Sequence, residues 1–152
     1  MDKIKIEPYK VIGISVRTTN ENNQAAKDIP VLWEKLMNEN ILSKIPNKID
    51  NTVYSIYTDY EKDHTKPYTT LLGCKVENLD TIPEGMIGKS FSGGDYVKFT
   101  VNGDLTQGLV INEWLKIWEM DLDRIFTADF ESYGEKAQNI SEAEVDILIA
   151  VK

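Results

Sequence analysis

The sequence has few of the residues that build metal centres and disulfides. It contains one cysteine, Cys74, and one histidine, His64. A single cysteine cannot form an internal disulfide, and structural zinc sites need several cysteine or histidine ligands. Cys74 ends the apolar run 71–74, which predicts a buried and unreactive thiol, whereas His64 lies in the charged loop 62–67 and is expected to face solvent. We therefore expect no metal site and no cofactor.

Long apolar runs are also missing. No run approaches the roughly 20 residues that a helix needs to cross a membrane, and the first residues, MDKIK, lack the apolar core of a signal peptide. Apolar residues still make up 41% of the chain, as in ordinary globular proteins. We expect a cytoplasmic protein with a single domain over residues 1–152 and no contact with a membrane.

Positive charge is in deficit. The chain has 17 lysines and arginines against 25 aspartates and glutamates, for a formal net charge of −8. Affinity for nucleic acid comes mainly from basic side chains that neutralise phosphates, so this balance argues against direct nucleic-acid binding. It favours cationic partners, although an acidic surface also serves solubility alone.

Familiar catalytic motifs are missing as well. The sequence has no Gly-x-Ser-x-Gly elbow, no phosphate-binding loop with a lysine and serine or threonine, and no His-Glu-x-x-His pair. The glycines within residues 92–95 lack the lysine and the following helix of a phosphate-binding loop, and they predict a turn. No catalytic residue is assigned from motifs, and whether the protein is an enzyme stays open.

Apolar periodicity predicts two similar halves, each in the order β-α-β-β, over residues 9–77 and 85–151 with a linker at 78–84. The predicted elements are a strand at 9–18, a helix at about 24–38, strands at 52–61 and 68–77, a bent hairpin at 85–101, a helix at about 106–118, and strands at 126–134 and 143–151.

A short segment occurs in both halves at comparable places. Residues 58–61 read TDYE and residues 128–131 read ADFE. We interpret the pair as an internal repeat. The prediction is an α+β fold of duplicated β-α-β-β units, with antiparallel sheets and two main helices around a pseudo-twofold axis that contains a ligand groove. In that arrangement Asp59 to Glu61 would be equivalent to Asp129 to Glu131.

This order of elements resembles a known family. The residues that carry the likeness are Leu32-Trp33, the NEWL segment at 112–115, ADFESYG at 128–134 and EVDILI at 144–149. Together they resemble the GyrI-like small-molecule-binding domain, which is also the effector-binding domain of AraC-type and MerR-type transcription regulators. The chain has no room for the helical DNA-binding domain of those regulators. The resemblance therefore implies a stand-alone module that binds small hydrophobic or cationic ligands.

Glu131 is the main candidate for a ligand anchor. The resemblance implies that it corresponds to the family's glutamate at the bottom of an aromatic-lined cleft. Strand alternation separately puts Glu131 and Tyr133 on one face and Phe130 on the other, so a Phe130 packed in the core would turn the first two toward the groove. A carboxylate beside aromatic rings suits a lipophilic cation. The alternative is an ordinary solvated charge on a strand.

Five further aromatic residues are candidates for the groove. Trp33 and Trp114 occupy comparable places on the two predicted helices, and Tyr57 is expected to face the groove from the first half as Tyr133 does from the second. Tyr68 and Phe91 are aromatic residues on predicted strands. Each of the five could instead be an ordinary core residue.

Three functions are compatible with these features. The first is a binding protein that senses or sequesters a hydrophobic, cationic or polar-aromatic compound. The second, implied by the resemblance, is a hydrolase that opens strained cyclopropane rings, with Glu131 and Tyr133 as its acid or base. The third is an acidic module that binds a protein partner, such as a gyrase inhibitor. The sequence assigns no oligomeric state.

Overall fold

The computed structural model describes residues 2–152 of the chain. Short 3₁₀ turns connect several of the main elements. In chain order the strands and α-helices are β1 (Lys3–Ile6), β2 (Tyr9–Thr18), α1 (Ala25–Asn38), α2 (Ile41–Lys44), β3 (Val53–Thr58), β4 (Tyr68–Val76), β5 (Ile87–Phe91), β6 (Gly94–Gly103), α3 (Leu109–Glu119), β7 (Ala128–Tyr133) and β8 (Ala143–Ala150).

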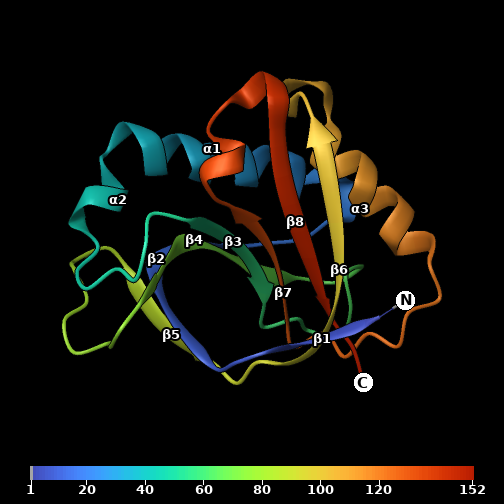
Figure 1. Ribbon diagram of the computed structural model, residues 1–152, viewed down its shortest axis with the longest axis horizontal. Helices are drawn as coiled ribbons and strands as arrows, with labels where there is room; N and C mark the ends of the chain where they lie inside the picture. Colours follow the sequence, from blue (N-terminus) through green and yellow to red (C-terminus); the bar gives the residue numbers. More distant parts are fainter. Residues whose placement is uncertain (1) are drawn as a thin grey trace.

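All eight strands form one antiparallel sheet that curls into a half-barrel (Figure 1). The strand order is β1-β6-β8-β7-β3-β4-β2-β5. If β1 is exchanged with β5, β2 with β6, β3 with β7 and β4 with β8, this order reads the same in reverse. The predicted α+β antiparallel class is confirmed. The two expected sheets are a single sheet, because β3 and β7 pair at its centre, from Val53 opposite Tyr133 to Thr58 opposite Ala128.

The two outer strands each pair with the opposite half of the chain. Strand β1 pairs with β6, and β5 pairs with β2. The predicted hairpin over 85–101 is therefore wrong, because β5 and β6 are not neighbours in the sheet. The predicted break between them is present, and Gly93 and Gly94 there have φ of 72° and 129°, which favour glycine.

The expected equivalence of the two four-residue segments is also wrong. Asp129 to Glu131 lie inside β7, whereas Asp59 to Glu61 follow the end of β3. Asp59 has a left-handed backbone with φ of 50°, which an aspartate tolerates and which ends the strand. The two segments share residue types without sharing a place in the fold.

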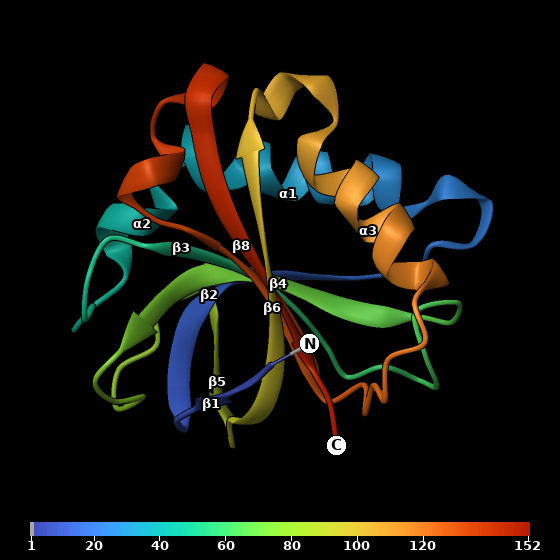
Figure 2. The ribbon, with the colours of Figure 1, turned by 45° about the vertical axis from the view of Figure 1, so that its right-hand side comes forward.

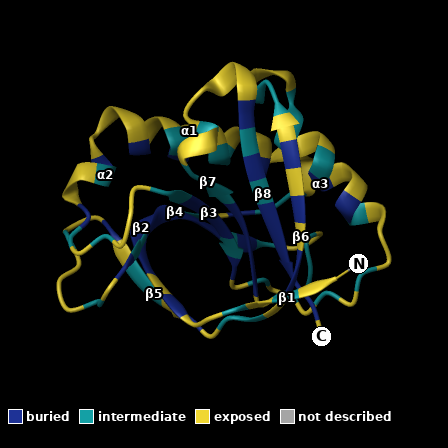
Figure 3. Ribbon diagram, viewed as in Figure 1, coloured by how far each residue is buried: buried dark blue, intermediate teal, exposed yellow. Residues whose placement is uncertain are grey.

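The helices cover one face of the sheet (Figure 2). A buried cluster rich in aromatic side chains fills the other face. Helix α1 packs through Leu32 and Leu36, and α3 packs through Trp114 and Ile117. Phe130 lies on the opposite face in a buried cluster, as strand alternation predicted. Figure 3 shows buried residues along the strands and exposed residues on the outer sides of the helices. Within residues 2–152, no helix is long and apolar enough to span a bilayer.

Cys74 gives a direct test of the packing between α1 and the sheet. The side chain is 1% exposed beneath α1, and burial raises the pKa of its thiol. We expect the native protein at pH 7 to react with a chromogenic disulfide reagent on the order of 100-fold more slowly than the unfolded chain, because the thiol is reached only when the structure opens. Equal rates for the native and the denaturant-unfolded protein would contradict this burial.

Candidate functional site

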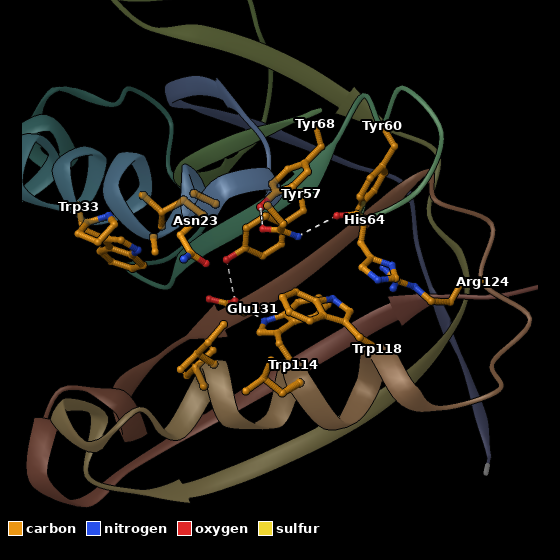
Figure 4. A pocket seen from close by; sticks show the side chains of 18 of the residues that line it. Asn23, Trp33, Tyr57, Tyr60, His64, Tyr68, Trp114, Trp118, Arg124 and Glu131 are labelled. Carbon is orange, nitrogen blue, oxygen red and sulfur yellow. Dashed lines mark hydrogen bonds between the residues drawn. The ribbon is translucent and has the colours of Figure 1, made fainter. Parts of the chain in front are cut away.

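A cavity of about 570 Å³ lies between the two long helices and the helix-facing side of the sheet (Figure 4). It is bordered by α1, α3, β3, β4, β7 and the loop 59–67. Its wall is strongly aromatic and includes all three tryptophans of the chain. The aromatic lining residues are Trp33, Tyr57, Tyr60, Tyr68, Trp114, Trp118 and Tyr133.

The structure brings six of the seven predicted site residues together around this cavity. They are Glu131, Tyr133, Trp33, Trp114, Tyr57 and Tyr68. Their contact with a ligand stays a prediction. Phe91 does not belong to this group, and its assignment is corrected here: it stacks on Tyr9 with ring centroids 4.9 Å apart, in the aromatic core on the other face of the sheet. Because β5 is an edge strand that pairs with β2 beside Tyr9, Phe91 packs into that core.

Glu131 is buried at the sheet side of the cavity, with 3% of its surface exposed. Its Oε2 accepts hydrogen bonds from the Tyr57 hydroxyl and from Nε1 of Trp114, both at 2.7 Å. Its Oε1 accepts one from the Tyr133 hydroxyl at 2.5 Å. Burial raises the pKa of Glu131, and the three hydrogen bonds act in the opposite direction. Within residues 2–152, no basic side chain forms an ion pair with it.

The three donors come from separate elements, and the local pattern explains each. Tyr133 lies two residues after Glu131 on the same strand and therefore on the same face. Ser55 pairs directly with Glu131 across β3 and β7, so Tyr57, two residues further on, shares that face. Trp114 reaches the carboxylate from α3. Burial raises the pKa of Tyr57 and of Tyr133 well above 10, which keeps both hydroxyls protonated as donors.

Edge-to-face contacts between the rings fix the aromatic wall. Tyr57 and Trp114 meet with ring centroids 5.5 Å apart, and Trp33 and Tyr133 meet at 5.0 Å. Both pairs are T-shaped, an arrangement that places the positive edge of one ring against the negative face of the other. The wall thus presents ordered π faces around the carboxylate.

The loop 59–67 contributes residues that the sequence did not assign to the site. His64, expected in solvent, is partly buried, and its ring stacks on Trp118 at 5.3 Å with the planes 5° apart. Asn20 holds the loop in place, because its side-chain amide donates to the His64 carbonyl at 2.8 Å and accepts from the Tyr68 hydroxyl at 2.7 Å. Burial, with Arg124 nearby, lowers the pKa of His64, so the imidazole is neutral at pH 7.

A buried ion pair borders the same end of the cavity. Asp129, fully buried, accepts from Nη2 of Arg124 at 2.8 Å and from the Tyr60 hydroxyl at 2.6 Å. Its other oxygen accepts from the backbone N–H of Ala150 at 2.8 Å. The Arg124 side chain is 6% exposed and lies over the Phe126 ring at 4.3 Å. Tyr60 and Arg124 both line the cavity, and sequence reasoning missed both.

Known proteins share this fold and, in part, this sequence. The profile of the Cass2 family, described as integron-associated effector binding protein, matches residues 4–151. A putative transcriptional regulator of Bacillus subtilis (strain 168), YobU, is 28% identical over 144 residues, which cover 92% of this chain and 90% of the relative.

Two solved structures extend the comparison. An integron cassette protein from the mobile metagenome of Vibrio cholerae is 32% identical, with a TM-score of 0.76 and coverage of 99% of this chain and 95% of that one. SAV2435, solved with bound tetraphenylphosphonium, is 12% identical with a TM-score of 0.80, and the match covers 99% and 93% of the two chains. That second likeness shows the fold alone. The chain therefore belongs to the Cass2 family of integron-associated effector binding proteins, and its predicted likeness to effector-binding domains is confirmed.

Proposed function

We propose that this protein binds hydrophobic aromatic cations in the cavity, with Glu131 as the counter-charge. The observation that carries the proposal is the state of Glu131, which is buried and hydrogen-bonded but has no cationic partner among the described residues. A buried carboxylate without a neutralising charge is unfavourable. A bound cation would supply the missing charge, and the aromatic wall would contact its apolar groups.

The size and the apolar surface of the cavity support the same proposal. Its volume of about 570 Å³ suits a small aromatic molecule. Ile111 and Leu115 on α3 also line it, yet they are 51% and 50% exposed. Large apolar side chains left open to solvent at the edge of a cavity are typical of a ligand site. The tetraphenylphosphonium bound to SAV2435, which has a similar fold, is a ligand of this class. The role we propose is sensing or sequestration of such compounds.

A matched pair of small molecules tests the proposal. Methyltriphenylphosphonium and triphenylphosphine oxide carry the same three rings, and the charged P–CH₃ group of one is replaced by a neutral P=O group in the other. Because all three tryptophans line the cavity, intrinsic fluorescence reports its occupancy. We expect the cation to bind roughly tenfold more tightly or better, since charge adds about 1.4 kcal/mol or more. Equal affinity for the two compounds, or no fluorescence change with either, would contradict the proposal.

The raised pKa of Glu131 favours one alternative, a hydrolase. A glutamate whose pKa is raised by burial, beside the Tyr133 hydroxyl, is suited to general acid or base catalysis. Incubation with cyclopropane-containing compounds followed by mass spectrometry separates the two functions. A hydrolase would produce a species heavier by one water molecule and would lose that activity in Glu131→Gln, whereas a binding protein returns every compound unchanged.

A further inference from the structure

The Arg124 end of the cavity contains polar groups that the proposed cation site does not use. Arg124 donates through Nη2 to Asp129, but its Nε and Nη1 are buried and have no hydrogen-bond partner in the described part of the chain. Nδ1 of His64 is buried and unpartnered in the same sense. Both side chains line the cavity.

Asp129 accepts from Arg124 through Nη2 only and leaves the other two guanidinium nitrogens without an acceptor. Its two oxygens accept from Arg124, Tyr60 and the Ala150 N–H. Buried N–H groups in folded proteins almost always find an acceptor, and a guanidinium stays charged at any physiological pH. An arginine side chain 6% exposed, with two of its three nitrogens unpaired beside a cavity, therefore indicates an acceptor that comes from outside the chain.

Aromatic contacts hold the two side chains at one end of the cavity. Arg124 lies over Phe126 at 4.3 Å, and the His64 ring lies between Trp118 at 5.3 Å and Phe126 at 6.4 Å. Figure 4 shows Arg124 and His64 close to Trp118, with Trp33 toward the other end and Glu131 beside Trp114. One cavity thus contains an acidic group without a cation and a basic group with donors to spare.

We propose that Arg124 and His64 form a second polar subsite, which binds an anionic acceptor group, a carboxylate, carried by the same aromatic cation that Glu131 binds. This inference rests on the proposed function and narrows its ligand class to aromatic compounds with both charges. Arg124 supplies charge and N–H donors, and the neutral His64 supplies one further N–H when Nδ1 carries the proton.

Triphenylphosphonium cations with a carboxyalkyl tail provide the test. Three tail lengths, carboxypropyl, carboxybutyl and carboxypentyl, each have an alkyl counterpart of equal length without the carboxylate. We expect the wild-type protein to prefer at least one carboxyalkyl cation over its alkyl counterpart by roughly tenfold, as a charge-assisted hydrogen bond provides. Tryptophan fluorescence and calorimetry measure the affinities.

Two variants separate the subsite from the cation site. Arg124→Lys keeps a positive charge for Asp129 but removes the guanidinium donors, and it should reduce the preference to about twofold or less while the alkyl cations bind as before. His64→Phe keeps a ring against Trp118, removes Nδ1, and should reduce the preference partly. It also serves as the test if Arg124→Lys fails to fold.

The outcomes are distinct. No preference at any tail length, or a preference that survives in both variants, would overturn the subsite and leave water as the partner of the buried nitrogens. If the wild-type protein bound none of the six cations, the proposed function would fail and this inference with it. If the wild-type protein binds the alkyl cations but shows no preference for a carboxyalkyl tail, the subsite fails and the proposed function stands.

Discussion

Glu131→Gln is expected to weaken the binding of methyltriphenylphosphonium by about 1.5 to 3 kcal/mol, or roughly 10- to 150-fold. Glutamine keeps the shape of the side chain and an oxygen that accepts hydrogen bonds, so the change removes mainly the charge. Affinity for triphenylphosphine oxide should change little. Glu61→Gln is the matched control. Glu61 is the glutamate of the TDYE segment at 58–61, but it is exposed and lies outside the cavity lining. Calorimetry on both variants with both compounds tests this prediction. Equal losses of affinity for the two compounds, or equal losses in the two variants, would show that Glu131 is not the anchor.

The raised pKa of Glu131 adds a pH dependence to this result. As pH falls, the buried carboxyl takes up its proton at a higher pH than an ordinary glutamate, so cation affinity should fall early in an acid titration. Glu131→Gln should show no such fall.

A folded-state pKa above the unfolded one means that the contribution of Glu131 to stability is fully present below the unfolded pKa and is lost as pH rises through the folded pKa. At pH 7 the glutamine variant should therefore be no less stable than the wild type.

Asp129→Asn is expected to lower the free energy of unfolding by about 3 to 5 kcal/mol, because it leaves the charge of Arg124 buried without a partner. Asparagine keeps an oxygen for the Ala150 N–H, so the loss reports the charge and not the shape. The control is Asp59→Asn, whose pair with Lys89 at 2.6 Å is one-third to one-half exposed and should cost only about 0 to 1 kcal/mol. Denaturant unfolding of both variants measures the difference. Similar losses at the two positions would show that the buried pair does not stabilise the fold.

The regular elements were largely predictable, because each rests on a local pattern. The helix expected at 24–38 is α1 at 25–38, and the alternation in β7 correctly put Glu131 and Tyr133 on one face and Phe130 on the other. The pairing of β5 and β6 with distant strands was not predictable in this way. Two strands joined by a tight turn favour a hairpin, and nothing in the turn shows that each strand has a more distant partner.

The candidate site was predictable where its residues lie on strands and helices and not where they lie in loops. Spacing put Tyr57, Trp114 and Glu131 on faces that could border the groove, and the family resemblance singled out Glu131. His64 and Arg124 lie in segments without periodicity, and their positions depend on tertiary contacts such as the hydrogen bond from Asn20 to the His64 carbonyl. The TDYE and ADFE segments also differ in their ion pairs. Asp59 pairs with a partly exposed lysine, whereas Asp129 pairs with a buried arginine.

The exchange of edge strands between the two halves affects the order of events during synthesis. Lys3 in β1 pairs with Val97 in β6, and Tyr9 in β2 pairs with Phe91 in β5. At translation rates of about 5 to 20 residues per second, the first strand leaves the ribosome several seconds before its partner exists. During that interval β2 presents an open hydrogen-bonding edge to its surroundings, the condition under which nascent chains associate with one another. Strand β5 closes that edge, so the first half of the chain is protected only after the opening strand of the second half has been synthesised.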